Sequence, residues 1–234
     1  MYKKSNLERP IDYFPQHKRK SYNYKNIKSY LDVPGWINDA AWIYEDIVKS
    51  LPDNAHIVEI GTYLGQSATR MAELLKQYNR SDVKFDSIDI FYLQHYSIVL
   101  RDDFDENTMT GVPPQFKKYV QDLQNLGIII LDICKHPLHQ LGLIDYVNYI
   151  CIDSHYAHKL YDDESLDFVW LDANHEYPYV FHELNTMWKK IKPNGILAGD
   201  DYNDIGVKTA VDNFLKENEV TEFKCNELSF YILK

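Results

Sequence analysis

The order of apolar and polar positions over residues 36–234 is typical of a protein built from alternating strands and helices. Short apolar runs indicate buried strands, and apolar residues three or four positions apart indicate amphipathic helices. These patterns predict strands at about 56–60, 83–91, 149–152, 166–171, 196–199, 222–225 and 229–233. They predict helices at about 36–51, 67–78, 116–126, 179–191 and 207–216. We expect Gly195 to supply the left-handed residue that stops the fourth helix.

This alternation predicts parallel βαβ units with right-handed crossovers. The last two strands have no helix between them and give an antiparallel edge. The predicted fold class is therefore α/β, with a Rossmann-like seven-stranded, mostly parallel sheet, one antiparallel edge strand, and helices on both faces. We divide the chain into a basic, Tyr-rich N-terminal arm (1–35) and a single domain (36–234). Within that domain, 92–147 has the least regular pattern and is expected to form a lid or acceptor-binding insertion.

Composition fits a soluble globular domain. The chain has 234 residues, 45% of them hydrophobic and 26% charged, which is enough for a sizeable core. No apolar run approaches the ~20 residues that cross a bilayer, and the N-terminus lacks an apolar signal core. We expect a cytoplasmic protein without a membrane partner. Three isolated cysteines indicate buried thiols rather than a disulfide framework, at Cys134, Cys151 and Cys225.

The net charge of −10 is distributed unevenly. Residues 1–28 hold eight basic and two acidic residues, a net +6, so the other 17 basic and 33 acidic residues carry −16. A basic arm can bind nucleic acid or anionic lipid, or can pack on its own acidic body or on a second copy of the chain. We favour packing, because an acidic body does not suit a broad phosphate-binding surface. We expect no nucleic-acid partner and keep a homo-oligomer open.

The loop after the first predicted strand has the chemistry of a nucleotide-cofactor site. Its two glycines are four residues apart, and the third glycine of the dinucleotide pattern G-x-G-x-x-G is missing. That third glycine serves close packing under a pyrophosphate, so its absence favours S-adenosylmethionine over NAD. Asp89 ends the second predicted strand and is placed to accept hydrogen bonds from ribose hydroxyls. The other candidate cofactor contacts in this region are Glu59, Gly61, Tyr63, Gly65 and Ser67.

Three carboxylates follow two strands that should be neighbours: Asp172 after the fourth, and Asp200 and Asp201 after the fifth. Anions held that close repel one another, and a hard divalent cation would compensate. Oxygen ligands favour Mg²⁺, with Mn²⁺ or Ca²⁺ as alternatives. The competing interpretation is a set of helix-capping aspartates that diverge into solvent. His175, three residues after Asp172, suits a general base at neutral pH, or else a capping or surface residue.

Other histidines offer a rival metal site. The spacings Cys134-x-His136-x-x-His139 and His155-x-x-His158 loosely suit zinc. They come from two different predicted elements, so we favour the carboxylate site.

Three motifs together carry a family resemblance: Val58-Glu59-Ile60-Gly61 through Gly65-Gln66-Ser67, residues 166–177 around Asp172 and His175, and residues 192–202 around Asp200 and Asp201. With these motifs, the chain resembles a class I S-adenosylmethionine-dependent methyltransferase. Within that superfamily it is similar to metal-dependent sugar O-methyltransferases of macrolide (macrocin and mycinamicin type) and aminocoumarin biosynthesis, and to cephalosporin hydroxylase-associated proteins.

The resemblance implies roles for particular residues. Asp172, Asp200 and Asp201 would bind the divalent cation, and His175 would act as the base. Asp172 would also contribute to catalysis and to the cofactor site, and Ser154 stands where the family often has a serine near the adenine. The resemblance does not extend to acceptor-binding residues in 92–147.

We therefore expect an S-adenosylmethionine- and metal-dependent O-methyltransferase whose acceptor is a hydroxyl-bearing small molecule or glycan, because neighbouring hydroxyls can chelate one cation. The alternatives are a catechol-type O-methyltransferase, an RNA methyltransferase that uses the basic arm, and an inactive cofactor-binding scaffold. The catechol family usually has Asp-Asn where this chain has Asp200-Asp201. Retention of the fold does not by itself fix activity.

Overall fold

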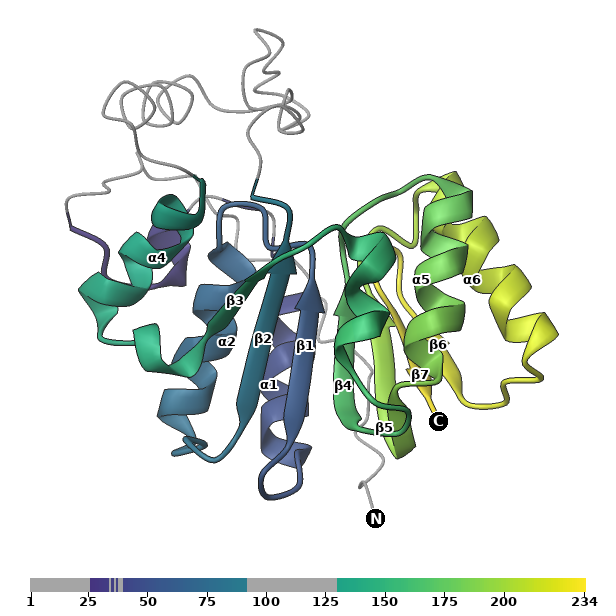
Figure 1. Cartoon of the computed structure of the whole chain (residues 1–234), viewed down its shortest axis with the longest axis horizontal. Helices are drawn as coiled ribbons and strands as arrows, with labels where there is room; N and C mark the ends of the chain where they lie inside the picture. The colour runs from purple at the N-terminus through teal and green to yellow at the C-terminus, as the bar shows by residue number, and fades with distance from the viewer. Residues whose placement is uncertain (1–25, 34, 36, 38–39, 92–129) are drawn as a thin grey trace, which may run out of the picture.

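A computed structural model describes residues 26–33, 35, 37, 40–91 and 130–234 of the chain (Figure 1). Seven strands form one sheet in the order β3-β2-β1-β4-β5-β7-β6. The strands are β1 (His56–Ile60), β2 (Lys84–Asp89), β3 (Asn148–Cys151), β4 (Leu166–Leu171), β5 (Ile191–Gly199), β6 (Phe223–Cys225) and β7 (Phe230–Leu233). The β1, β2, β3, β4 and β5 strands pair in parallel, whereas β7 pairs antiparallel with both β5 and β6. The predicted fold class is confirmed.

The described helices cover both faces of this sheet. They are α1 (Ala40–Ser50), α2 (Gln66–Gln77), α4 (Ile130–Leu141), α5 (Tyr177–Trp188) and α6 (Ile205–Glu217), with 3₁₀ helices η1 (Tyr30–Asp32), η4 (Ile144–Tyr146) and η5 (Ser154–Leu160). One apolar core lies under α1, α2 and α4 and includes Tyr44 and Trp170. The other lies under η5, α5 and α6 and includes Leu184 and Phe214. Figure 1 shows α5 and α6 side by side at one end of the molecule, and α2 and α4 at the other.

The sequence patterns placed β1 and β4 correctly and the other strands within a few residues, except for β5. That strand begins at Ile191 rather than near 196, and α5 ends at Trp188. The expectation for Gly195 was wrong, because the left-handed residue is Asn194, with φ 66°. Gly195 is needed for space instead, since a Cβ there would lie 2.7 Å from Cγ2 of Ile191 and 2.9 Å from the carbonyl oxygen of Lys192.

The predicted helix at 116–126 lies outside the described residues, as do residues 1–25 of the arm and 92–129 of the insertion. The described part of the insertion contains α4, which the sequence patterns missed.

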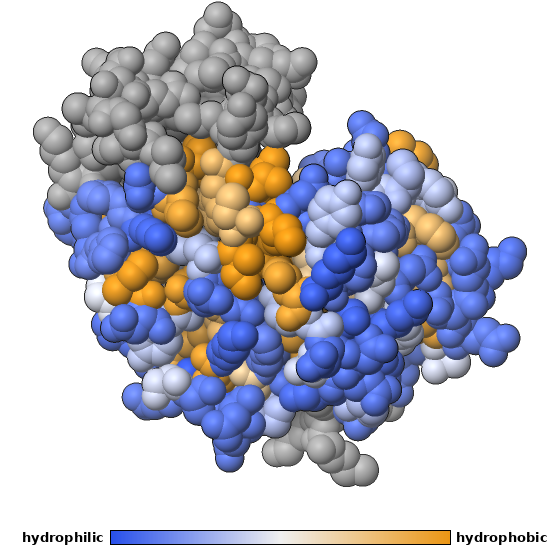
Figure 2. Space-filling model, viewed as in Figure 1, coloured by the Kyte–Doolittle hydropathy of each residue, from blue (hydrophilic) through white to orange (hydrophobic). Residues whose placement is uncertain are grey.

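Apolar side chains lie at the surface next to β3, in the upper middle of Figure 2. In the part of the chain that the structure describes, no helix has the length and apolar character needed to span a membrane.

The described end of the arm packs on the body. Gln66, the first residue of α2, accepts a hydrogen bond from the amide of Ile37 (3.1 Å) and donates to the carbonyl oxygen of Val33 (2.7 Å). Glu73, two turns further along α2, accepts from the amide of Tyr30 at 2.9 Å. For residues 26–33, 35 and 37, therefore, packing on the chain's own body is the observed arrangement.

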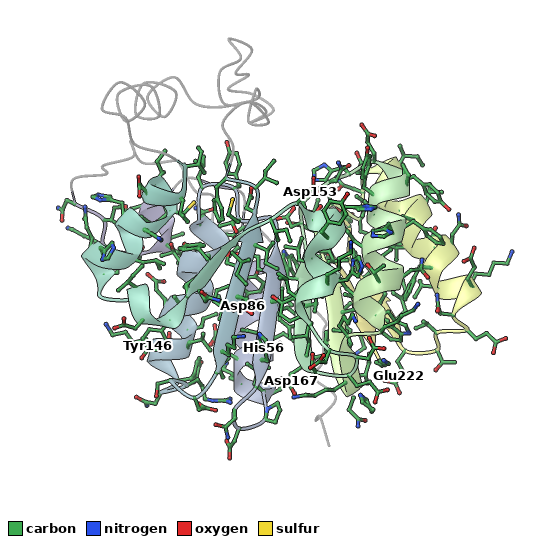
Figure 3. The ribbon with its side chains drawn as sticks, viewed as in Figure 1. His56, Asp86, Tyr146, Asp153, Asp167 and Glu222 are labelled. Atoms are coloured by element: carbon green, nitrogen blue, oxygen red, sulfur yellow. The ribbon has the colours of Figure 1, made fainter. Side chains whose placement is uncertain are left out.

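A polar network holds the amino ends of the strands together. Asp86 of β2 is fully buried and accepts hydrogen bonds from Nε2 of His56 (2.7 Å), Nδ2 of Asn148 (2.7 Å) and the hydroxyl of Tyr161 (3.1 Å). Asp167 of β4 accepts from the backbone amide of His56, at 2.8 Å. Figure 3 shows Asp167 and His56 near one end of the sheet, far from Asp153 at the other. Burial alone would raise the pKa of Asp86, but the hydrogen bonds from His56 and Asn148 outweigh it and lower that pKa.

We predict that Asp86→Asn destabilises the fold by about 3 kcal/mol at pH 7, since it breaks a buried ionic network. Because the folded-state pKa of Asp86 lies below its unfolded value, its contribution to stability is present above the unfolded pKa of ~3.9 and is lost as pH falls through the folded pKa. Urea unfolding at pH 7, 5 and 3.5 should therefore show a difference between wild type and variant that shrinks toward acid. The matched control is Asp46→Asn, at an exposed position of α1. An equal loss at every pH would contradict the assignment.

Candidate functional site

The glycine-bearing loop lies at the carboxyl end of β1, between β1 and α2. β1 has β2 on one side and β4 on the other, so the order of strands reverses at this point. Ligands of open α/β sheets bind at such a switch point. Gly61 and Gly65 have φ of 101° and 89°, and Tyr63 between them is also left-handed, with φ 49°. Glycine adopts these angles without steric cost, which explains the two glycines of the motif.

Asp89, at the end of β2, binds this loop directly. Its Oδ2 accepts hydrogen bonds from the backbone amides of Thr62 and Tyr63, at 2.9 Å each. Its Oδ1 accepts from the amide of Phe91 at 3.0 Å. Asp89 therefore anchors the glycine-bearing loop to the end of β2. Its predicted contact with ribose stays a prediction.

Glu59, the fourth residue of β1, is buried beneath the same loop, with 1% of its surface exposed. Its carboxyl group accepts hydrogen bonds from the hydroxyls of Tyr44 (3.1 Å) and Ser87 (2.8 Å), and the Ser67 hydroxyl also bonds to it. Burial raises the pKa of Glu59 to about 7, although these hydroxyls oppose the shift. Both Glu59 and Ser67 stay predicted cofactor residues, and in this arrangement they support one another under the loop.

The loops after β4 and β5 bring Asp172, His175 and Asp201 together. One candidate ligand atom from each of the three lies within 4.8 Å of the other two. Nε2 of His175 lies 3.0 Å from Oδ2 of Asp201. Asp201 lies two residues beyond the end of β5 at Gly199, and its backbone is in the left-handed region, with φ 56°. This backbone turn aims the Asp201 carboxylate at the loop that follows β4.

Asp200 points elsewhere. Its Oδ1 accepts a hydrogen bond from the hydroxyl of Ser229, at the start of β7, at 3.2 Å. Its charge nevertheless acts on Asp172. Of the three predicted metal ligands, the structure thus gathers Asp172 and Asp201 with His175 in one cluster, and holds Asp200 beside that cluster by a different partner.

Charge is crowded at Asp172. Burial, followed by the negative charges of Asp200 and Asp201, raises the pKa of Asp172 well above its usual value. The hydrogen bond to Asp201 raises the pKa of His175 and favours the imidazolium. Asp201 and His175 thus form an ion pair beside the partly buried Asp172.

The rival zinc arrangement does not form. Sγ of Cys134 donates to the carbonyl oxygen of Tyr63, and His136 lies 2.6 Å from Nε2 of Gln140. The ring of His155 stacks on that of His182 at 4.0 Å. Across residues 26–91 and 130–234, apart from the undescribed positions 34, 36 and 38–39, the cluster of Asp172, His175 and Asp201 is the metal-competent group of His, Cys, Asp or Glu residues.

Residues 58–202, more than half of the chain, match a protein family described as a methyltransferase domain. The chain belongs to this family. The match begins within β1, spans the glycine loop and both acidic loops, and ends at Tyr202. The expected enzyme class is confirmed: the protein is a methyltransferase. No curated protein sequence matches the chain significantly.

Solved structures of methyltransferases share its fold. An S-adenosylmethionine-dependent O-methyltransferase from Thermotoga maritima is 11% identical, with TM-score 0.51, over 83% of this chain and 64% of that one. A proposed caffeoyl-CoA O-methyltransferase from Staphylococcus aureus is 13% identical, with TM-score 0.55, over 87% and 86%. The O-methyltransferase NovP is 15% identical, with TM-score 0.56, over 91% and 88%. At these identities the likeness shows the fold alone.

Two features of the candidate site depend on close backbone approach, and sequence reasoning did not single out their roles. A Cβ on Gly61 would lie 2.0 Å from the carbonyl oxygen of Asp172. A Cβ on Gly206, in the first turn of α6, would lie 2.2 Å from the carbonyl oxygen of His175. The glycine loop and α6 therefore clamp the His175 loop from two sides. The available signal for Gly206 was its place two residues after Asp204, which caps α6.

We predict that Gly206→Ala lowers methyl transfer at least ~10-fold, because the new methyl group collides with main-chain atoms that cannot move aside and displaces the His175 loop. Initial rates and thermal unfolding of the purified variant measure the effect.

Gly142→Ala is the matched control. Gly142 is also left-handed (φ 63°), but a Cβ there meets nothing closer than Nζ of Lys76 at 3.8 Å. This control should lose about 1 kcal/mol of stability and keep its turnover. Equal turnover in the two variants would contradict the role assigned to Gly206.

Proposed function

We propose that this methyltransferase is an S-adenosylmethionine-dependent, divalent-metal-dependent O-methyltransferase that acts on a hydroxyl group of a sugar or glycan. The observation that carries the proposal is the cluster of Asp172, His175 and Asp201, set directly against the glycine loop. Family membership and the shared fold with S-adenosylmethionine-dependent methyltransferases support the cofactor. The named activity of NovP and of the Staphylococcus aureus protein supports transfer to oxygen.

The residues at the site fit a divalent cation. Asp172 is partly buried beside the negative charges of Asp200 and Asp201, and carboxylates held this close repel one another unless a positive charge compensates them. Carboxylate oxygens are the ligands that Mg²⁺ and Mn²⁺ prefer. Asp172 and Asp201 would hold the cation. Asp200 would become a third acidic ligand on turning away from the Ser229 hydroxyl that it accepts from in this structure. A bound divalent cation makes a coordinated hydroxyl more acidic and stabilises the developing alkoxide.

His175 is the proposed base. Its side chain is about half exposed, so an acceptor hydroxyl can reach it. In the neutral form of His175, Nε2 donates to the Asp201 carboxylate, which orients the ring and leaves Nδ1 to accept a proton. The rest of the chain's contribution is alignment, because the clamp from Gly61 and Gly206 fixes the His175 loop against the cofactor loop.

A hydroxyl-rich acceptor panel with radiolabelled S-adenosylmethionine, with and without chelator, tests the function. We expect methyl transfer to acceptors with two neighbouring hydroxyls, no transfer after chelation, and recovery on adding Mg²⁺ or Mn²⁺. Transfer to catechols but not to sugars would replace the acceptor class. Undiminished transfer after exhaustive chelation would remove the metal from the proposal.

The roles of His175 and Asp201 are separable. We predict that His175→Ala lowers turnover ~100-fold or more, the usual contribution of a general base, while Mn²⁺ affinity stays within about threefold. Asp201→Asn should instead weaken Mn²⁺ binding at least ~10-fold. Calorimetric titration of each variant, paired with rates at saturating metal, makes the comparison. If His175→Ala loses the metal, His175 is a ligand and the base lies elsewhere.

A further inference from the structure

Part of the N-terminal arm is bound across two helices of the body. This part consists of residues 26–33, 35 and 37, here called the N-terminal strap. The backbone amide of Ile27 donates to Oε1 of Gln140 on α4, at 3.0 Å, and the amide of Tyr30 donates to Oε1 of Glu73 on α2, at 2.9 Å. Three apolar side chains of the strap are buried, those of Ile27, Val33 and Ile37. The strap therefore joins α2 to α4.

Gln66 uses its whole side-chain amide to hold this strap. Its Nε2 donates to the carbonyl oxygens of Val33 (2.7 Å) and Tyr30 (3.3 Å), and its Oε1 accepts from the amide of Ile37 (3.1 Å). A glutamine amide has two protons to donate, so both are engaged here. The backbone of the strap also approaches closely, because a Cβ on Gly35 would lie 2.6 Å from Cβ of Gln66. Gln66 thus binds the strap and has no proton left to donate to a ligand.

Gln66 is the first residue of α2 and directly follows the glycine loop. In that loop, the amide of Gly65 donates to the carbonyl oxygen of Thr62 at 2.9 Å. The carbonyl oxygen of Gly65 accepts from the amide of Thr69 (2.9 Å) and from its hydroxyl (2.6 Å). These bonds tie the loop to the first turn of α2, and a tightly packed interior transmits displacements. A shift of Gln66 is therefore passed to the glycine loop.

The other helix under the strap, α4, contacts the same loop. Sγ of Cys134 donates to the carbonyl oxygen of Tyr63 at 3.3 Å, and a Cβ on Gly65 would lie 3.2 Å from Cα of Cys134. Tyr63 has φ 49°, a left-handed angle that a residue with a side chain keeps only where the surrounding structure holds it. The two helices that contact this strained loop are the two that the strap joins.

We propose that Gln66 is a positioning residue, which fastens the N-terminal strap to the start of α2 and so keeps the glycine loop in the conformation that binds the cofactor. The inference rests on the proposed function in taking S-adenosylmethionine as the ligand of that loop. When the competent conformation is only partly populated, the apparent affinity falls by that fraction, whereas the bound complex is unchanged. Loss of the contact should therefore weaken cofactor binding and preserve the turnover of the loaded enzyme.

Gln66→Met tests the proposal, because methionine is also unbranched and flexible but its thioether cannot donate a hydrogen bond. The dissociation constant for S-adenosylhomocysteine, from calorimetric titration of the full-length protein, should rise at least ~10-fold. Turnover at saturating S-adenosylmethionine should change less than about twofold. The matched control is Gln77→Met, the same substitution at the exposed last residue of α2, and it should change neither quantity.

Hydrogen exchange measures the loop itself. The amides of Thr62, Tyr63 and Gly65 are hydrogen-bonded, so their exchange reports how firmly the loop is held. In Gln66→Met without cofactor, mass spectrometry should show exchange at least ~10-fold faster in a peptide that covers residues 61–66. A peptide that covers β2 should exchange as in wild type, which separates local loosening from destabilisation of the whole domain.

Gly35→Ala disturbs the same contact from the strap, since the new methyl group would collide with Gln66. This variant should also raise the dissociation constant for S-adenosylhomocysteine. The double variant should raise it by less than the product of the two single effects, because both changes break one contact. If Gln66→Met does not fold, Gly35→Ala decides the question.

The outcomes distinguish this inference from the function beneath it. Affinity within about threefold of wild type in both single variants overturns the role of Gln66 and leaves the proposed function intact. Equal acceleration of exchange in the loop and in β2 also overturns that role, because Gln66 would then only stabilise the domain. Failure of the wild-type protein to bind S-adenosylhomocysteine overturns both.

Discussion

Repulsion between carboxylates at the carboxyl ends of β1, β2, β4 and β5 is the constraint around which the candidate site is built. The charge of Asp89 meets two amides of the glycine loop, and the carboxyl group of Glu59 meets hydroxyls from Tyr44 and Ser87. Asp201 meets the imidazole of His175. Asp172 lies among these acids, and burial together with the charges of Asp200 and Asp201 raises its pKa well above the usual value. Each loop is folded so that its amides or side chains interact with one of these acids.

The loops are mechanically coupled because their backbones are in direct contact. Gly61 faces the carbonyl oxygen of Asp172, Gly199 faces that of Leu171, and Gly206 faces that of His175, each closer than a side chain would allow. Interiors packed this tightly transmit a displacement rather than absorb it. A change in the glycine loop therefore reaches Asp172 directly. This contact gives the proposed cofactor and metal sites a common mechanical basis.

The sequence was sufficient where the fold depends on local pattern. β1 and β4 lie in the middle of the sheet and are buried on both faces, so they appear as continuous apolar runs, and the acids that end parallel strands meet at one edge. The sequence was insufficient where a role depends on contacts between distant segments. Nothing near Gly206 indicates that it packs on residue 175, and nothing near Ser229 indicates that it binds Asp200.

Aspartates lie at both ends of the parallel strands, but the two groups differ in how their charges are compensated. At the amino ends, Asp86 receives hydrogen bonds from His56, Asn148 and Tyr161, and Asp167 receives them from His56 and Lys192. These buried acids are satisfied by donors within the fold, so they stabilise it and need no ligand. At the carboxyl ends, Asp201 pairs with His175 and Asp200 accepts from Ser229, while the charges of both raise the pKa of Asp172. Several partly exposed carboxylates are gathered there, and their mutual repulsion is a cost that a bound cation or substrate would relieve.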